Sequence, residues 1–390
     1  MNASDKLGCF TESVIREMTR LSEKFGAINL AQGMPDFDPP SELIDAAVEA
    51  IRHGSNQYPI TWGQRSLREA IARKVKGYNG IDADAEANIT ITCGSTEAVA
   101  SAMFALTNPH DLVVLTDPYY ENYVPNAILA QCELIHVPFT DPNFTLAEES
   151  LKGAMEKHPK LIVLTTPNNP TGKVLGSDQL KLVADLCEDH ETIAITDEIY
   201  EHILYDGKKH VSLATVGNMH ARTVTVSGAS KTYSVTGWRV GWAIADAKLT
   251  EALRKVHDYL TIGAPTPMQE ALVTALNFPH IFYEKLAETY DVKRQFVMRA
   301  LDKIGLEYYR PEGAFYILID APDSFKDGHE FADYLLKKGS VAVLPADVLY
   351  HNKELGKRKV RLAYCKRDAT LEEVARRLGT LSPGRNEKAR

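Results

Sequence analysis

Residues 223–241 read TVTVSGASKTYSVTGWRVG and carry the most informative pattern of the 390-residue chain. The β-branched run Thr223–Val226 predicts a short buried strand that leads through small residues to Lys231. A solvated surface lysine is the simplest interpretation, because lysines are rarely buried. A partly buried lysine beside a cationic group instead has a lowered pKa and can form a Schiff base with a carbonyl compound.

Arg239 follows within the same apolar stretch. An unpaired guanidinium would be costly to bury there, so we expect an anionic partner. A bound phosphate would pair with it through two hydrogen bonds, whereas an intramolecular salt bridge is the simpler alternative.

Similar short apolar runs recur through the middle of the chain, separated by helical patterns such as Ser95–Leu106 and Asp178–Cys187. Strands joined by helical crossovers predict a mainly parallel sheet of seven strands between layers of helices, an α/β fold. Reactive residues should then follow the strands directly, at their carboxyl ends. The predicted strands are Ile89–Thr92, Leu112–Thr116, Glu133–Val137, Leu161–Thr165, Ile193–Thr196, Thr223–Val226 and Val240–Ile244.

The pattern changes after about Pro279, where a long helix over Ile281–Ile304 precedes further strands and a helix over Phe331–Lys338. This indicates a smaller α+β domain with strands at Ala314–Ile319, Val341–Leu344 and Val360–Ala363. We divide the chain into an N-terminal arm that joins the small domain (1–45), a large domain (46–290) and a C-terminal small domain (291–390). The polar tail Pro383–Arg390 is expected to fray.

The composition narrows the class of protein. A net charge of −8 argues against a general nucleic-acid binder, and with it against a DNA-binding regulator. Five scattered cysteines without a CxxC pair favour a reducing compartment, and no secretory signal or membrane-spanning run is evident, so we expect a cytoplasmic protein. The histidines show no HExxH or other metal-binding spacing, so no metal is predicted.

Polar side chains follow several predicted strands. Ser95 and Thr96 begin a helix where a phosphate could bind, although a helix cap with nothing bound is the alternative. Asn169 lies in a Pro/Asn/Gly stretch that could equally be a rigid turn. Asp197 closes an apolar strand, where it is either a surface helix cap or a buried acid that requires a cationic partner.

These motifs together resemble the class I aminotransferases of pyridoxal-phosphate (PLP) fold type I. The resemblance covers nearly the whole chain and rests on six motifs in order: Gly94-Ser95-Thr96, Asn168-Asn169-Pro170-Thr171-Gly172, Asp197-x-x-Tyr200, Ser230-Lys231, Trp238-Arg239-x-Gly241 and a late Arg361. The opening Asn29–Phe37 is similar to the kynurenine/glutamine/methionine aminotransferase branch.

The resemblance implies a role for each matching residue. Lys231 would hold PLP as a Schiff base and move the proton, and Asp197 would pair with the protonated ring nitrogen so that the ring stays an electron sink. Tyr200 and Asn169 would hydrogen-bond the phenolate oxygen of the cofactor. The phosphate would be bound by Ser95, Thr96 and Arg239.

The resemblance also implies residues at the periphery of the site. Tyr120 would stack on the cofactor ring, with Tyr119 as the second choice, and Tyr58 would reach the phosphate of a partner subunit, which makes a homodimer the active unit. Arg361 would bind the substrate α-carboxylate with two hydrogen bonds, and Gly33 would let the backbone approach the same group. From its charge alone, Arg361 in a basic run would be a solvated residue.

One position departs from the family pattern. Some relatives carry a serine three residues before the lysine, where this chain has Gly228. Ser227 or Ser230 could supply the missing phosphate contact.

The resemblance predicts an aminotransferase with a ping-pong mechanism that moves an amino group from an L-amino acid to a 2-oxo acid. We find no second arginine for a distal carboxylate, so neutral, aromatic or sulfur-containing donors are favoured, and an aminotransferase specific for aspartate or alanine stays an alternative. A lyase, synthase or oxidase of the same fold is the alternative, because the motifs serve the steps that these enzymes share.

Overall fold

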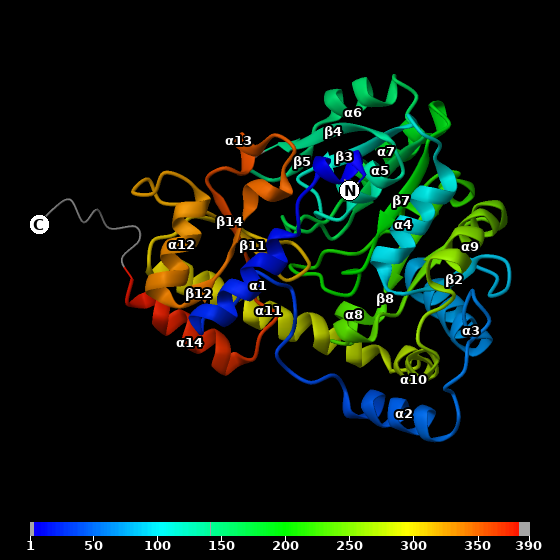
Figure 1. The fold of residues 1–390 in the computed structure, drawn as a ribbon, viewed down its shortest axis with the longest axis horizontal. Coiled ribbons are helices and arrows are strands. Elements are labelled where there is room, and N and C mark those ends of the chain that lie inside the picture. Colours follow the sequence, from blue (N-terminus) through cyan, green and yellow to red (C-terminus); the bar gives the residue numbers. More distant parts are fainter. Residues whose placement is uncertain (1–3, 141, 382–390) are drawn as a thin grey trace, which may run out of the picture.

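A large mixed sheet and a small antiparallel sheet organise the computed structural model, which describes residues 4–140 and 142–381 (Figure 1). The tail Pro383–Arg390 lies outside these residues. No helix within the described ranges combines the length and the apolar character needed to cross a bilayer.

The large sheet has eight strands in the order β2-β9-β8-β7-β6-β3-β4-β5. The strands β3, β4, β6, β7 and β8 pair in parallel, whereas β9 and β5 are antiparallel to their neighbours. In chain order they are β2 (Ile89–Thr92), β3 (Leu112–Asp117), β4 (Glu133–Thr140), β5 (Thr145–Leu146), β6 (Leu161–Thr165), β7 (Ile193–Asp197), β8 (Thr223–Gly228) and β9 (Gly241–Ile244).

The predicted strands all form, but the predicted count of seven was wrong. The two-residue strand β5 extends the sheet at its edge by turning back on the end of β4. A strand this short has no period of its own in the sequence, so it could not be recognised.

Helices cover both faces of the large sheet, as its two-sided apolar strands predict. On β3, Val113 and Leu115 pack with α4 and α5, whereas Val114 faces the side that holds α6 and α7. The helices of this lobe are α2 (Ser41–Arg52), α3 (Arg65–Lys74), α4 (Ser95–Leu106), α5 (Tyr123–Leu129), α6 (Glu148–Met155), α7 (Ser177–Asp189), α8 (Ala229–Thr232), α9 (Ala247–Thr261) and α10 (Thr266–Leu276).

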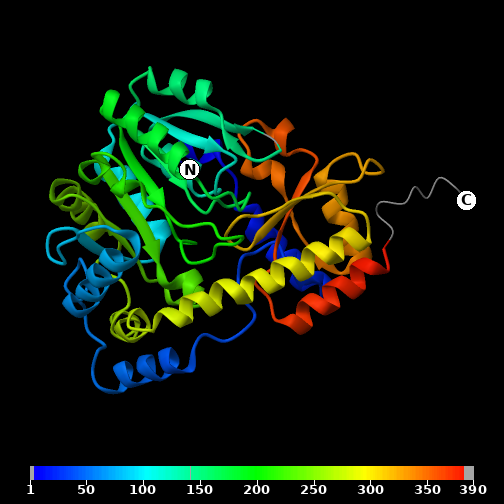
Figure 2. The same ribbon diagram turned by 180° about the vertical axis from the view of Figure 1, so that it is seen from behind.

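The small lobe is an antiparallel sheet in the order β10-β11-β14-β13, packed against helices. Its strands are β10 (Tyr308–Tyr309), β11 (Tyr316–Asp320), β13 (Leu344–Pro345) and β14 (Lys359–Ala363). Its helices are α11 (His280–Lys303), α12 (Gly328–Gly339), α13 (Lys353–Gly356) and α14 (Asp368–Gly379). Figure 2 shows α11 reaching from the large lobe along the small one.

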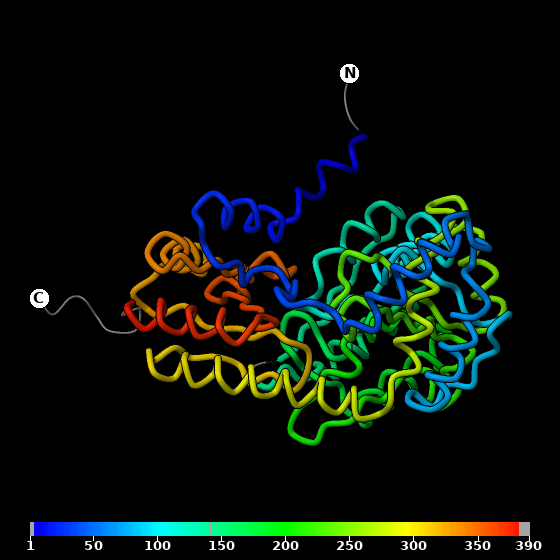
Figure 3. Tube along the Cα trace, turned by 90° about the horizontal axis from the view of Figure 1, so that it is seen from below, coloured from blue at the N-terminus to red at the C-terminus, as the bar shows by residue number. Residues whose placement is uncertain are grey.

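The N-terminal arm contributes to the small lobe. Helix α1 (Val14–Phe25) packs beside α12, and β1 (Ile28–Asn29) pairs in parallel with β12 (Val341–Ala342). Figure 3 shows this arm crossing from the small lobe toward the large one. The predicted single strand Val341–Leu344 was wrong: β12 pairs with the arm, and after Val343 the chain turns to pair with β14 as β13.

Candidate active site

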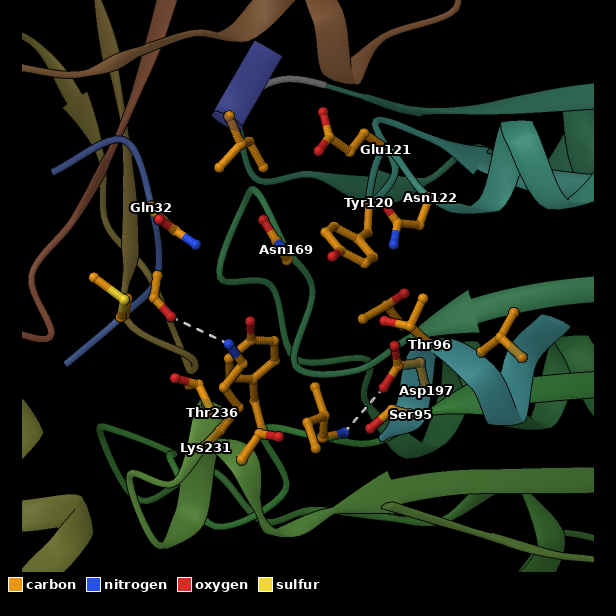
Figure 4. Close-up of a pocket in the computed structure, with 18 of the residues that line it drawn as sticks. Gln32, Ser95, Thr96, Tyr120, Glu121, Asn122, Asn169, Asp197, Lys231 and Thr236 are labelled. Carbon is orange, nitrogen blue, oxygen red and sulfur yellow. Dashed lines mark hydrogen bonds between the residues drawn. The ribbon is translucent and has the colours of Figure 1, made fainter. Parts of the chain in front are cut away.

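A pocket of about 500 Å³ lies where the carboxyl ends of the large-sheet strands face the small lobe. Ser95 follows β2, Asp197 ends β7 and Lys231 follows β8, so three strands of the large sheet deliver their polar side chains to one place. Arg361 comes from β14 of the small sheet. Figure 4 shows Lys231, Asp197 and Ser95 in one part of the pocket, with Tyr120 and Glu121 across from them.

Lys231 is not the solvated lysine that its residue type suggests. It lies on the short helix α8, where burial lowers its pKa to about 8. Its Nζ donates to the Gly33 carbonyl oxygen at 3.1 Å and forms no ion pair with any described carboxylate. The amine is therefore easily deprotonated and free to react.

Asp197 is a buried acid rather than a surface helix cap, with 6% of its surface exposed. Tyr123 donates to Oδ2 at 2.7 Å, and the Ile199 N–H donates to Oδ1 at 3.2 Å. Burial raises the pKa of Asp197 to about 6, although the Tyr123 hydrogen bond opposes the shift. No described cation forms an ion pair with it, so the site has room for a cationic ligand group.

Arg361 is 1% exposed, so its interpretation as a solvated charge was wrong. Its guanidinium donates to Asn169 Oδ1 at 2.7 Å and to the Ala31 carbonyl at 2.6 Å, and it lies 4.4 Å from the Tyr316 ring centroid. These partners are neutral, and the Nε atom is buried with no hydrogen-bond acceptor. A buried guanidinium without an acid in the described chain requires an anionic ligand.

Ser95, Thr96 and Arg239 surround the start of α4 at the pocket. Gly94 precedes this helix with φ +79°, and a Cβ there would lie 2.3 Å from an Arg239 nitrogen, so only glycine fits. Neither Ser95 nor Thr96 caps the helix, because Gly94 occupies the N-cap position. Hydroxyls and free backbone N–H groups at a helix N-terminus suit an anion.

The expected environment of Arg239 was partly wrong. Its side chain is exposed and donates to the carbonyls of Cys93 at 3.3 Å and Thr236 at 3.1 Å. It forms no salt bridge with any carboxylate of the described residues, so the intramolecular alternative fails. The neighbours of Arg239 in the sequence are apolar and pack in the core, whereas Arg239 adopts the left-handed backbone conformation with φ 54°. Its guanidinium lies beside Gly94.

The structure distinguishes the two serines near Gly228. Ser227 Oγ donates to Glu201 Oε1 at 2.7 Å and does not line the pocket. Ser230 does line it, so only Ser230 is placed to contact a ligand there.

Tyr200, Asn169, Tyr120 and Gly33 also line the pocket. Tyr200 shares a 2.9 Å hydrogen bond with the Tyr316 hydroxyl, and a Cβ on Gly33 would lie 2.1 Å from that Tyr316 oxygen. A residue other than glycine would therefore displace Tyr316 from the pocket.

Two other predicted tyrosines lie outside the pocket. The Tyr119 ring packs at a tilt against His136, with ring centroids 5.5 Å apart. Tyr58 is 82% exposed, and nothing in the described chain carries it into the pocket of its own subunit.

A second group of buried charges does not line the pocket and is internally paired. Lys74 Nζ is 2.6 Å from Glu201, and His210 Nε2 is 2.7 Å from Glu198. Although burial opposes it, the Lys74 charge holds the pKa of Glu201 well below its usual range. Glu198, Glu201 and His210 have metal-ligating atoms close together, but each carboxylate already has a partner in the chain, Lys74 for Glu201 and His210 for Glu198.

The pocket residues that were missed from the sequence include Tyr123, Tyr316 and Arg16. Tyr123 ends the aromatic-rich run that follows β3, which could have signalled a third tyrosine at the strand end. Tyr316 and Arg16 come from β11 and α1, and no pattern in the sequence links those elements to the large sheet.

Comparison with known proteins agrees with this geometry. Residues 26–378 match the family described as aminotransferase class I and II. The chain is 33% identical to a probable N-succinyldiaminopimelate aminotransferase of Mycobacterium tuberculosis, over 97% of this chain and 98% of that protein. It is 34% identical to the methionine aminotransferase of Escherichia coli, over 96% of this chain and 97% of that protein.

Solved structures give the same result. The N-succinyldiaminopimelate aminotransferase of M. tuberculosis superposes with a TM-score of 0.95 at 33% identity, covering 97% of this chain and 100% of that one. Among the relatives found by sequence, a kynurenine–oxoglutarate transaminase of Dictyostelium discoideum is 30% identical over 95% of this chain and 94% of its own length. The chain therefore belongs to the class I and II aminotransferase family and is an aminotransferase.

Proposed function

We propose that the pocket binds PLP and transfers an amino group from a neutral, aromatic or sulfur-containing L-amino acid to a 2-oxo acid. One observation carries the proposal: Lys231, Asp197 and Arg361 are charged, largely buried and without an ionic partner among the described residues, and all three line one pocket. Buried charges of this kind need ligand charges to offset their desolvation.

The residues fit the groups of PLP. Lys231 would bond to the aldehyde carbon, Asp197 would hold a proton on the pyridine nitrogen, and the cluster of Ser95, Thr96, Ser230 and Arg239 would bind the phosphate. Tyr120 would cover the ring. When bound, PLP supplies the electron sink that lets an amino acid lose its α-proton.

The protein's own groups would perform the proton transfer. The lowered pKa of Lys231, about 8, leaves a useful fraction of its amine neutral near physiological pH, so it can accept the α-proton and return it. Tyr200 and Asn169 would donate hydrogen bonds to the phenolate oxygen of the cofactor. Arg361 would orient the substrate α-carboxylate, with its free Nε available as an additional donor.

The donor preference rests on the lining of the pocket and on the relatives. Tyr120, Ile15 and Met34 provide apolar surface for a side chain. The E. coli relative is a methionine aminotransferase, and an enzyme from Thermococcus litoralis at 33% identity is an aromatic-amino-acid aminotransferase.

A half-reaction screen tests this proposal. Protein loaded with PLP would be mixed with single amino acids, and the change in cofactor absorption and the release of 2-oxo acid would be recorded. Methionine, phenylalanine and kynurenine should each yield one equivalent of 2-oxo acid per site without free ammonia. Release of ammonia, or conversion of aspartate or alanine alone, would contradict the proposal.

We also propose a homodimer whose active sites share Tyr58. An exposed apolar surface lies around this residue and comprises Tyr58, Ile60, Tyr259, Leu260 and Ile262, of which Tyr259 is 92% exposed. Apolar surface of this kind commonly marks an interface. Sedimentation should give a dimer. Tyr58→Phe should weaken the affinity for PLP without dissociating the dimer. A monomer of full activity would contradict this assembly.

The cytoplasm is the compartment that we propose. The five cysteines are all unpaired in the structure, and two of them, Cys187 and Cys365, are buried. Thiols in this state are typical of reducing conditions.

A further inference from the structure

A second pocket lies on the large lobe, outside the active site. It has a volume of about 420 Å³ and lies between one face of α9 and two segments that precede β2, at residues 61–62 and at Ala87. Figure 1 shows α9 and β2 on the side of the large lobe that is remote from the small lobe. None of the residues that line this pocket belongs to the active-site pocket or to the exposed apolar surface around Tyr58.

Arg254 presents an unpaired cation to this second pocket. Its Nε donates to Thr90 Oγ1 at 3.2 Å and its Nη2 donates to the Ile89 carbonyl at 2.7 Å, whereas its Nη1 has no hydrogen-bond partner among the described residues. The guanidinium carbon lies 5.0 Å from the Trp62 ring centroid. Burial and the charge of Arg68 lower the pKa of Arg254 to about 10. A half-buried guanidinium with only neutral partners has donors available for an anion.

An unpaired acid lies on the same face of α9. Asp258 follows Arg254 by four residues, the spacing at which opposite charges on a helix commonly pair. The two side chains nonetheless form no ion pair, and the Asp258 carboxylate accepts no hydrogen bond within the part of the chain that the structure describes. Glu251 and Lys255 have the same spacing on this helix and do pair, at 2.8 Å. The pocket therefore retains one cation and one anion that the chain itself does not neutralise.

Hydrogen bonds hold the walls of the second pocket in place. His257 on α9 is buried, and its Nε2 donates to the Thr61 carbonyl at 2.7 Å. Arg254 joins the same helix to β2. Because both contacts fix α9 against the opposite wall, the pocket is formed before a ligand enters. Trp62 and Ala87 add apolar surface to that wall.

We propose that this second pocket binds a free α-amino acid, with its carboxylate on Arg254 and its ammonium group on Asp258. An α-amino acid carries both charges on one carbon atom, so a single small ligand can neutralise two opposite charges that lie one helical turn apart. The Trp62 ring suits an apolar side chain of that ligand. Because the two pockets share no residue, the inference goes beyond the proposed function and does not depend on it.

Calorimetry on the holoenzyme with three related probes tests the proposal. L-leucine carries both charges, N-acetyl-L-leucine lacks the ammonium group, and L-leucinamide lacks the carboxylate. The holoenzyme would first be reduced with borohydride, so that no amino acid can react at Lys231. Leucine that still binds at the active site does so equally in wild type and in variants of the second pocket, so the difference between them reports the second pocket alone.

Two variants each remove one of the unpaired charges. Arg254→Gln should weaken leucine binding at the second pocket at least about tenfold, because the charged hydrogen bonds to the carboxylate are lost. Asp258→Asn should weaken it by a similar factor, and this variant breaks no contact within the described chain. At this pocket, N-acetyl-L-leucine and L-leucinamide should each bind at least about tenfold more weakly than leucine.

A matched control and the possible outcomes complete the experiment. Lys248→Gln removes a positive charge from the first turn of α9, outside the pocket, and should leave leucine binding unchanged. Equal leucine binding in wild type, Arg254→Gln and Asp258→Asn would overturn the proposal. Binding of N-acetyl-L-leucine as tight as that of leucine would also overturn it, because the site would then accept anions alone. An equal loss in Lys248→Gln would overturn it as an effect of net charge.

Failure of the proposed function would be recognised separately. It would appear as the absence of conversion of any amino donor by wild type, and it would leave the differences in leucine binding among these variants unchanged.

Discussion

Two groups of buried charges differ in how their charges are balanced. The paired network comprises Lys74, Glu198, Glu201 and His210: Glu201 lies 2.6 Å from the Lys74 ammonium, and Glu198 lies 2.7 Å from the His210 imidazole. The unpaired set comprises Lys231, Asp197 and Arg361, which have neutral partners. The difference teaches that burial of a charge alone does not identify a functional residue, whereas burial without a compensating charge does.

The comparison predicts that Lys231→Ala abolishes activity and preserves the fold. Transamination should fall by at least about 10³-fold, because the amine that moves the proton is removed. The melting temperature of the cofactor-free protein should not decrease, since no ion pair is broken. Steady-state kinetics and thermal unfolding measure the two effects; substantial activity in this variant would refute the assignment.

The largest stability effect should come from the paired network. Lys74→Met leaves Glu201 buried without its cation and should reduce the free energy of unfolding by about 3–5 kcal/mol. The matched control is Lys76→Met, because Lys76 and its partner Asp82 are exposed; it should cost less than about 1 kcal/mol. Denaturant titration of both variants measures their free energies of unfolding. Equal losses of unfolding free energy in Lys74→Met and Lys76→Met would refute the special role of the buried pair.

The pH dependence of stability should distinguish the unpaired Lys231 from the residues of the paired network. The pKa of Lys231 is about 8 in the folded, cofactor-free protein and near 10.5 when unfolded. Between these values the unfolded chain binds more protons, so this residue makes the folded state more stable as pH rises from about 8 toward 10.5. The difference in unfolding free energy between wild type and Lys231→Met should therefore shift in favour of wild type over this range. A difference independent of pH would show that the amine is not desolvated.

The smallest of these effects is expected for Arg361→Lys. Lysine keeps the charge but loses the two-pronged contact, so substrate KM should rise roughly 10- to 100-fold with a smaller change in kcat. The measurement is steady-state kinetics across several amino donors. An unchanged kcat/KM for all of them would remove Arg361 from substrate binding.

Most of the large sheet followed from the sequence because each strand is a short β-branched run between helices, and burial on both faces gives that pattern. The edge strand β5 and the division of Val341–Leu344 between two sheets did not follow. Those features depend on which strand lies alongside, and an apolar run does not encode its neighbour.

The site shows the same division. Lys231, Asp197, Ser95 and Thr96 follow large-sheet strands directly, so topology predicts that they meet. Arg16 and Tyr316 reach the pocket from α1 and the small sheet, and only the packing of the two lobes reveals them. The exposure of Arg239 likewise depends on its left-handed backbone conformation, which its apolar neighbours in the sequence do not predict.

The most direct test of the central claim is to locate the cofactor covalently. The protein would be incubated with excess PLP, reduced with borohydride, digested and analysed by mass spectrometry. The account predicts one pyridoxyl group per chain on the peptide that contains Lys231, and none on Lys231→Ala. A label distributed over surface lysines, with Lys231 unmodified, would contradict it.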